Sequence, residues 1–378
     1  MSIGSVPLAL AFLLSAALVA ALCRVAPRIG LVDTPTARKV HHGRVPLCGG
    51  IAMFIALLAG MAVREGLGSS DGVGPAGALG LDSWPFVGAL AMLVAIGVAD
   101  DRWELGALPK LALQIIAVGI LLGLGVEIRA DVGILHLPAS MSMHRWIAMP
   151  VALVFVVGVI NAFNMIDGLD GLAGGIAAVA LTGLALAGTL TGHARLVDDS
   201  LLLLAVILGF LVFNLRRPGL PRALAFMGDA GSMMLGCAVA ALVVELSSSP
   251  IATEGDVAVL PALLWLVAIP AIDTLSLMVR RPLAGRSPMA ADRRHLHHLL
   301  LDSGASPMLA TALLIAIAAI LGAVGIAGIV TRASAPLMMA GLAAPAMAHT
   351  TFVLACGYRQ RRRAPQNQAL AVSSEPAE

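Results

Sequence analysis

Residues 147–190 consist of two apolar runs, IAMPVALVFVVGVI and LAGGIAAVALTGLALAGTL, separated by the polar turn NAFNMIDGLDG. The uncharged stretches extend from Ile147 to Phe163 and from Leu172 to Leu190. Runs of about 15 to 25 such residues are long enough to cross a bilayer as helices. The sequence here therefore predicts two membrane helices, with Asn and Asp side chains gathered where they meet.

The composition of the whole chain agrees with a membrane protein. Of its 378 residues, 59% are hydrophobic and 12% charged, and the mean hydropathy is +0.94. Soluble domains carry about a quarter charged residues. The net charge of +2 is small and the basic residues are scattered, so no nucleic-acid partner is expected. The four cysteines have no paired spacing, unlike those of a disulfide framework or a CxxC metal site.

The apolar runs together predict an all-α, polytopic bundle of about eleven transmembrane helices. The other runs are Ser5–Cys23, Leu47–Val63, Pro85–Ala99, Leu111–Val126, Leu201–Asn214, Ala230–Ser247, Val259–Val279, Pro307–Val330 and Pro336–Gly357. The third and seventh in chain order are short, and a re-entrant segment at either would reverse every later side assignment.

Basic residues predict the orientation. Of the 24 Lys and Arg residues, the loops after even-numbered spans hold only Arg64, Arg129, Arg145, Arg195 and Arg332. Loops rich in Lys and Arg stay in the cytoplasm. We therefore expect a periplasmic N-terminus, a cytoplasmic C-terminus and the loops after odd-numbered spans on the cytoplasmic face. The N-terminus lacks a basic n-region, so the first run is expected to be a retained span.

The predicted organisation is a single transmembrane catalytic domain over residues 1–357 and a cytoplasmic tail over residues 358–378. The tail, YRQRRRAPQNQALAVSSEPAE, is rich in polar and small residues, which predicts disorder. Its basic beginning is expected to contact lipid headgroups.

Polar residues collect in a few segments. These are DTPTARKVHHGRVPLCGG (33–50), DDRWELGALPK (100–110), NAFNMIDGLDG (161–171), FMGDAGS (226–232) and DRRHLHHLL (292–300). Each follows an odd-numbered span, so all of them are expected at the same face of the membrane. They can therefore converge into one site.

Carboxylates are prominent in these segments. Asp100 and Asp101 are adjacent at the end of the third span. A solvated helix end would explain such a pair alone, but the other acidic segments on the same face favour a cation site. Asp167 and Asp170 are three residues apart, and a helical turn would place both on one face.

Asn164 and Asp229 carry oxygen atoms of the kind that Mg²⁺ prefers, with water and phosphate completing its octahedron. Asp229 could also cap the helix that follows it, and the two roles are compatible. Asp273 lies within the ninth span, where a charge is costly unless it is paired or functional. Structural pairing and support of the site are equally open for it.

His295, His297 and His298 follow Arg293 and Arg294. A zinc site is disfavoured, because the sequence has no HExxH motif and no partner cysteine. Imidazole and guanidinium donors beside an acidic cation site are typical of a clamp for a diphosphate or a sugar hydroxyl.

In this order, the segments resemble the polyprenyl-phosphate N-acetylhexosamine-1-phosphate transferases (glycosyltransferase 4 type). This family includes the muramyl-pentapeptide and dolichyl-phosphate GlcNAc-1-phosphate enzymes. The resemblance extends through nearly all the spans and includes PAIDTLSLMVRR at 270–281. The HLHH sequence is similar to the bacterial undecaprenyl-phosphate GlcNAc-1-phosphate branch, and the HHHFE-type run of muramyl-pentapeptide transferases is lacking.

The resemblance implies a role for each site residue. Asn164 and Asp229 would bind Mg²⁺; Phe226 would stack on uracil, with Gly168, Leu169 and Asp170 lining the uridine pocket; Asp100, Asp101 and Asp167 would be catalytic; Lys110 and Lys39 would bind the lipid phosphate; and Arg293, His295, His297 and His298 would lie over the diphosphate and sugar. Ala230 stands where many members have Thr or Ser, which affects at most one hydroxyl contact.

The implied reaction transfers GlcNAc-1-phosphate from UDP-GlcNAc to undecaprenyl phosphate, giving GlcNAc-diphospho-undecaprenol and UMP. It would be the first lipid-linked step of a cell-envelope polysaccharide such as O-antigen. The implied cofactor is Mg²⁺, with Mn²⁺ as a substitute. The implied partners are a UDP-sugar, a polyprenyl phosphate and membrane lipid, and a homodimer is left open.

The expected chemistry is an in-line attack by the lipid phosphate on the β-phosphorus, with Asp100 removing or orienting a proton. A covalent aspartyl intermediate is the alternative. A rival function is that of a muramyl-pentapeptide or other UDP-hexosamine phosphotransferase. A distant rival is an ion-coupled transporter, which would place its charges near the bilayer midplane and often contain inverted repeats.

Overall fold

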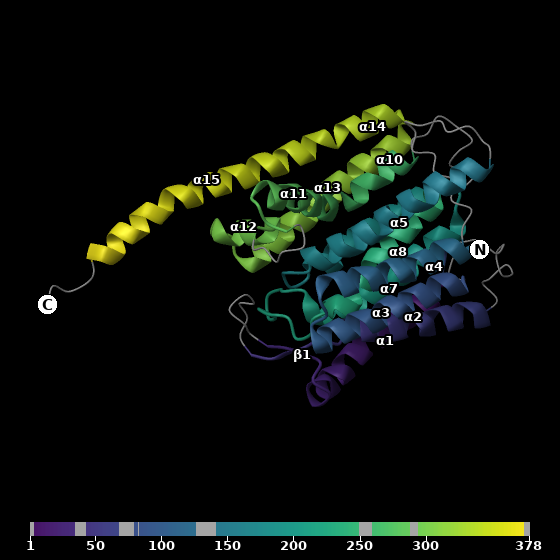
Figure 1. Ribbon diagram of the computed structural model, residues 1–378. Coiled ribbons are helices and arrows are strands. Elements are labelled where there is room, and N and C mark those ends of the chain that lie inside the picture. The colour runs from purple at the N-terminus through teal and green to yellow at the C-terminus, as the bar shows by residue number, and fades with distance from the viewer. Residues whose placement is uncertain are drawn as a thin grey trace.

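Eleven helices are long and apolar enough to cross a membrane in the computed structural model, which describes residues 4–34, 43–67, 79–81, 83–125, 141–248, 259–287 and 294–373. The predicted all-α, polytopic fold is confirmed, and the two short runs are complete spans. Figure 1 shows the helices side by side in one bundle.

The first part of the chain forms α1 (Ser5–Val25), β1 (Val32–Asp33), β2 (Val45–Pro46), α2 (Gly49–Gly66), α3 (Trp84–Trp103), α4 (Ala107–Gly125), α5 (Met141–Ile166) and α6 (Leu172–Leu190). The second part forms α7 (Ala194–Asn214), α8 (Gly228–Ser248), α10 (Val259–Leu263), η2 (Leu264–Val267), α11 (Ala268–Leu283), α12 (Leu296–Asp302), α13 (Pro307–Val330), α14 (Ala335–Gly341) and α15 (Ala343–Ser373). The ninth span is continuous over Val259–Leu283, through α10, η2 and α11.

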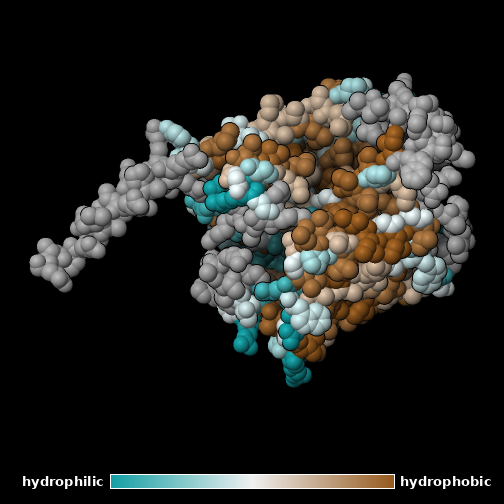
Figure 2. Space-filling model, in the orientation of Figure 1, coloured by the Kyte–Doolittle hydropathy of each residue, from teal (hydrophilic) through white to brown (hydrophobic). Residues whose placement is uncertain are grey.

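Helix α8 lies at the centre of the bundle and is buried along almost its whole length. It packs against α2, α3 and α5, and its GDAGSMMLGCAVAA sequence supplies the small residues that let helices approach closely in a membrane. The outer helices leave large apolar side chains exposed, for example Leu13, Val154 and Ile320. Figure 2 shows hydrophobic surface over the flank of the bundle and hydrophilic residues gathered at the end that carries β1 and α12.

Helix α7 begins seven residues before the predicted span at Leu201, because charged residues interrupt its apolar pattern. Asp199 is fully buried there and pairs with Arg64 of α2, whose Nη1 lies 2.5 Å from Oδ1. The backbone N–H of Leu81 donates to the other carboxylate oxygen at 2.9 Å. Arg64 is therefore a buried structural partner and not a solvated loop charge.

The segments rich in polar residues meet at the opposite end of the bundle. The C-terminal ends of α3, α5 and α11, the N-terminal ends of α4 and α8, and α12 all lie there, beside the β1–β2 pair (Figure 1). The predicted convergence on one face is thus confirmed. Its assignment to the cytoplasm stays a prediction from loop charge.

The division into a catalytic domain over residues 1–357 and a disordered tail over residues 358–378 stays a prediction. Helix α15 continues from the last span to Ser373 and extends beyond the bundle (Figure 1). Composition supplies the reason, since Arg, Gln and Ala are good helix formers that can prolong a helix already nucleated by packing.

Candidate active site

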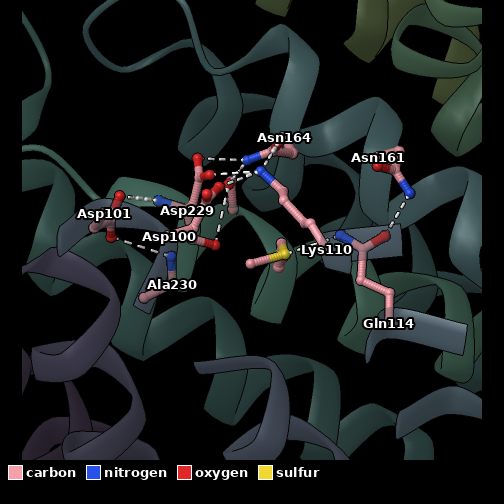
Figure 3. Close-up of polar contacts among 10 residues, drawn as sticks. Asp100, Asp101, Lys110, Gln114, Asn161, Asn164, Asp229 and Ala230 are labelled. Atoms are coloured by element: carbon pink, nitrogen blue, oxygen red, sulfur yellow. Dashed lines mark hydrogen bonds and ion pairs between the residues drawn. The ribbon is translucent and has the colours of Figure 1, made fainter. Parts of the chain in front are cut away.

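Lys110, in the first turn of α4, gathers three side chains from three other helices. Its Nζ donates to Oδ2 of Asp100 at 2.7 Å, to Oδ1 of Asn164 at 3.0 Å and to Oδ2 of Asp229 at 2.5 Å. Figure 3 shows these side chains pointing toward the lysine nitrogen. We call these four residues the Lys110 cluster. It joins three of the polar segments into one cation-centred site, lined mostly by acceptors.

Asp101 does not face the lysine. Its Oδ1 accepts the backbone N–H of Asp229 at 2.9 Å, and its Oδ2 accepts that of Ala230 at 3.4 Å (Figure 3). A carboxylate at these unpaired N–H groups caps α8 and matches the positive end of its dipole. The cap depends on close packing, because a Cβ at Gly97 would overlap the backbone nitrogen of Ala230.

Gly228, at the start of α8, also allows the close approach of Asp101 to this helix. It has a φ of +68°, which favours glycine, and a Cβ there would overlap the carboxylate of Asp101. The glycine of the FMGDAGS segment thus lets Asp101 reach α8. Asp101, predicted to be catalytic, is placed to position Asp229.

Asn164 links α5 to α8. Its Nδ2 donates to Oδ1 of Asp229 at 2.7 Å and to Oγ of Ser232 at 2.9 Å. One turn earlier, Asn161 donates to Oε1 of Gln114 at 2.7 Å. The sequence did not single out Ser232 or Gln114. For Gln114, a polar residue in an apolar run is the signal that would have found it.

The donor set around Lys110 fits the Mg²⁺ that the family resemblance implies. In the described part of the chain, no three His, Cys, Asp or Glu side chains are grouped to hold a metal ion. Here the oxygens come from two carboxylates and one amide, on Asp100, Asp229 and Asn164. Mg²⁺ prefers such oxygens and commonly takes only one or two carboxylates, with water and substrate phosphate supplying the rest.

The turn between α5 and α6 corrects one expectation. Asp167 and Asp170 do not share a helical face, because α5 ends at Ile166 and α6 begins only at Leu172. Asp170 instead accepts from Nε of Arg216 at 2.6 Å and from the backbone N–H of Ala223 at 2.9 Å. This predicted uridine-pocket residue anchors the segment that leads to α8.

Asp167 is the first residue of the same turn, directly after the end of α5. Burial, followed by the negative charges of Asp229 and Asp101, raises its pKa well above the usual range of a carboxyl group. A cation that enters the site would stabilise the charged form of this carboxyl group and so lower its pKa.

Phe226 is held by its backbone. Its N–H donates to the carbonyl of Pro46 at 2.9 Å, and its own carbonyl accepts from the N–H of Gly49 at 3.0 Å. The segment before α8 is thus joined to the segment before α2. Phe226 is half-buried, and Leu169 is half-buried beside the exposed Gly168.

The histidine cluster lies against the turn between α5 and α6. The rings of His295 and His297 stack with centroids 5.5 Å apart, and His298 follows at 4.2 Å from His297. His297 is 1% exposed, and a Cβ at Gly168 would overlap its Nε2. Burial and the neighbouring His298 and His295 lower the pKa of His297 to about 3, so the ring is neutral at physiological pH.

The structure brings together the predicted residues of the Lys110 cluster, with Asp101 and Asp167 beside it, and places His297 on Gly168. Lys39 and Arg293 lie outside the described residues. His349 of α15 was missed, although it contacts Asp273. An ionisable side chain in the last apolar run is the signal that would have found it.

Comparison with known proteins places the chain in a family. Residues 83–247 match the model of glycosyl transferase family 4. An undecaprenyl-phosphate alpha-N-acetylglucosaminyl 1-phosphate transferase of Salmonella typhi is 32% identical over 80% of this chain and 78% of its own length. The enzyme of the same name from Haemophilus influenzae is 31% identical over 79% of this chain and 80% of its own.

A decaprenyl-phosphate N-acetylglucosaminephosphotransferase of Mycolicibacterium smegmatis is 33% identical, over 75% of this chain and 71% of its own length. The similarity spans the helices that carry the Lys110 cluster, since the matched family region begins just before α3 and ends within α8. The chain therefore belongs to glycosyl transferase family 4.

Proposed function

We propose that this protein transfers GlcNAc-1-phosphate from UDP-GlcNAc to undecaprenyl phosphate, in a Mg²⁺-dependent reaction that releases UMP. The observation that carries the proposal is the Lys110 cluster. Its ammonium group contacts Asp100, Asn164 and Asp229 within 3.0 Å at a bundle end where polar segments converge. The names of the relatives from Salmonella typhi and Haemophilus influenzae support the sugar and the lipid acceptor.

Two anionic substrates must meet in this reaction, so the site has to offset their repulsion. The ammonium of Lys110 is a fixed positive charge for the lipid phosphate. Asn164 and Asp229 would hold Mg²⁺, together with substrate oxygens. When bound, Mg²⁺ supplies charge neutralisation on the diphosphate and on the departing UMP.

Asp100 is assigned to the acceptor. Its carboxylate lies 2.7 Å from the lysine nitrogen, so it can accept or orient a proton at a phosphate held by the same lysine. The second pKa of a phosphate monoester is near 6, so the acceptor is largely dianionic at neutral pH. Positioning therefore contributes more than proton removal, and a direct in-line displacement needs no covalent aspartyl intermediate.

The nucleotide is assigned to the turn after α5 and the segment before α8. Phe226 presents a half-buried ring from a backbone fixed on both sides, which suits stacking on uracil. Gly168, Leu169 and the anchored Asp170 line the neighbouring wall. His295, His297 and His298, with Arg293, would then cover the diphosphate and the sugar, and Lys39 would join Lys110 at the lipid phosphate.

The bacterial relatives support a place in the inner membrane, and loop charge supports an active site on the cytoplasmic face. The product would begin a lipid-linked polysaccharide of the cell envelope, such as O-antigen. The proposal also includes Mn²⁺ as a substitute for Mg²⁺ and a homodimer as the oligomeric state.

The test is transfer of label from UDP-[¹⁴C]GlcNAc to an organic-extractable lipid by the purified protein with undecaprenyl phosphate, with Mg²⁺, Mn²⁺ or EDTA. Metal-dependent label in the lipid phase that is lost on adding UMP is expected. Label only from UDP-MurNAc-pentapeptide would favour the muramyl branch. Absence of transfer from every UDP-hexosamine would overturn the proposal.

A variant pair tests the metal assignment. Asp229→Ala is expected to abolish Mg²⁺-dependent transfer without unfolding the bundle. Thr182→Ala is the matched control, because among the described residues this exposed hydroxyl bonds only to the carbonyl of Ala178 in its own helix. Activity of Asp229→Ala at low Mg²⁺ would remove Asp229 from the metal site.

A further inference from the structure

Asp273 of α11 is a buried carboxylate outside the Lys110 cluster. It is 1% exposed and accepts three hydrogen bonds. Its Oδ2 faces Nδ1 of His295 at 2.9 Å, and its Oδ1 faces Nε2 of His349 at 3.0 Å and the backbone N–H of Leu296 at 3.0 Å. Asp273 thus ties the start of α12 and the last membrane helix, α15, to α11.

These contacts fix the protons on two imidazole rings. An ionised carboxylate only accepts hydrogen bonds, so His295 carries a proton on Nδ1 and His349 carries one on Nε2. The Nε2 of His295 is then the ring nitrogen left for other partners. The Nδ1 of His349 is fully buried and has no hydrogen-bond partner in the described part of the chain. Among the described residues, His349 is therefore linked to the site by hydrogen bonds only through Asp273.

The orientation of the His295 ring also affects the turn after α5, because His297 connects the two. Its ring stacks on that of His297 at an interplanar angle of 14°. His297 in turn lies against Gly168, where a Cβ would overlap its Nε2. A rotation of His295 would consequently disturb the stack that covers the proposed diphosphate and sugar position.

We propose that Asp273 and His349 are positioning residues for His295, and that α15 is through them a part of the active site. This inference rests on the proposed function. Asp273 holds the Nδ1–H tautomer of His295, and His349 holds the Asp273 carboxylate in place through its second oxygen. The closest general parallel is a carboxylate that orients a functional imidazole without touching substrate.

A purely structural role would be different. In that case, His349 would only offset the burial of Asp273 and attach α15 to the bundle. Kinetic measurements distinguish the two roles of His349. Positioning of His295 affects the rate of the chemical step, whereas attachment of α15 affects the stability of the protein.

The experiment compares His349→Phe, which keeps the ring volume without a donor, with His349→Gln, whose side-chain amide reaches as far as Nε2. Asp273→Asn is measured alongside. The control is Thr350→Ala, since in the part of the chain that the structure describes the side chain of this exposed neighbour bonds only to the carbonyl of Ala346 in α15. Rates are measured over a range of UDP-GlcNAc concentrations at saturating lipid and Mg²⁺, with thermal unfolding in detergent.

His349→Phe is expected to lower kcat about tenfold with KM unchanged, an effect typical of outer partners of a functional histidine. His349→Gln and Thr350→Ala should stay within twofold of the wild type. A kcat of His349→Phe within twofold of the wild type would overturn the inference. Equal losses in both His349 variants with lowered unfolding temperatures would also overturn it, in favour of the structural role.

A measurement without turnover separates this inference from the proposed function. In protein labelled with ¹⁵N-histidine, the signal that disappears in His295→Gln belongs to His295. It should report a proton on Nδ1 in the wild type and change in Asp273→Asn. A ring protonated on Nε2 alone would overturn the positioning role, even if the transfer assay succeeds. An Nδ1–H ring in a protein inactive toward every UDP-hexosamine would leave the positioning intact and overturn the reaction.

Discussion

Asp101 of α3 accepts the backbone N–H of Asp229 at the first turn of α8, at 2.9 Å. Its neighbour Asp100 instead bonds to Lys110 at 2.7 Å. Two adjacent carboxylates with the same sequence signal thus have separate tasks. Asp101 sets the position of Asp229, and Asp100 belongs to the cation-centred cluster.

This division predicts that substitutions of Asp101 affect both stability and rate, whereas substitution of Asp100 affects mainly the rate. Asp101→Ala should lower the free energy of unfolding by about 1 kcal/mol, the usual value of a helix N-cap, and also lower activity by displacing Asp229. Asp101→Asn keeps an acceptor and should retain most of the stability. Asp100→Asn should slow transfer with little effect on unfolding or on UDP-GlcNAc binding. Thermal unfolding and initial rates check the set, and an unfolding loss only in Asp100→Asn would contradict it.

Lys110→Met is expected to lower kcat/KM about 100-fold, because it leaves Asp100 and Asp229 facing each other without their shared cation. Lys110→Arg restores the charge but not the compact ammonium geometry, so it should recover only part of the rate. Initial rates at several Mg²⁺ concentrations make the comparison. A Lys110→Met rate within threefold of the wild type would show that the lysine is not needed for catalysis.

Gly168→Ala should raise the KM for UDP-GlcNAc, since its Cβ would push His297 away from the turn after α5. Gly158→Ala in α5 is the matched control, because a Cβ there meets nothing within 4 Å. Steady-state kinetics of the two variants, with unfolding temperatures, checks this. Equal KM values for both would mean that the His297 contact does not shape the donor site.

Arg64→Met should lower the free energy of unfolding by about 3 to 5 kcal/mol, because it leaves the buried Asp199 charge without its partner. The active-site end is remote, so the fraction that remains folded should turn over normally. Arg64→Met combined with Asp199→Leu removes both charges and should recover much of the loss. Detergent-solubilised unfolding measures the series, and a double variant no better than Arg64→Met would contradict the ion-pair explanation.

His297 predicts a dependence of stability on pH. Its pKa is about 3 in the folded protein, against an ordinary 6.5. Between these values the unfolded chain binds a proton that the folded one does not, so stability falls as pH is lowered from 6.5 toward 3. His297→Gln cannot titrate and should lose less stability than the wild type between pH 7 and pH 4. Parallel unfolding temperatures over that range would contradict a buried neutral His297.

The order of the spans predicts that the polar segments lie at one face. Each of these segments follows an odd-numbered span, and a chain that crosses a membrane repeatedly emerges on the same side after every second span. The spacing of residues in the sequence does not predict which of these side chains form hydrogen bonds with one another. Asp167 and Asp170 were expected to share a helical face, but the helix ends between the two spans and they diverge. His349 had no sequence motif around it, and its link to Asp273 spans 76 residues of chain.

The sequence by itself determined the number of spans among the described residues, their approximate places and the convergence of the polar segments on one face, because lipid requires long uncharged helices and allows charge mainly at their ends. Tertiary structure decided which donor meets which acceptor. Glycines such as Gly97 let α3 touch α8, and this close approach assigned Asp101 to a helix cap and Asp100 to Lys110. Periodicity records which face of a helix is apolar, whereas hydrogen bonds depend on ångström-scale packing between helices distant in sequence.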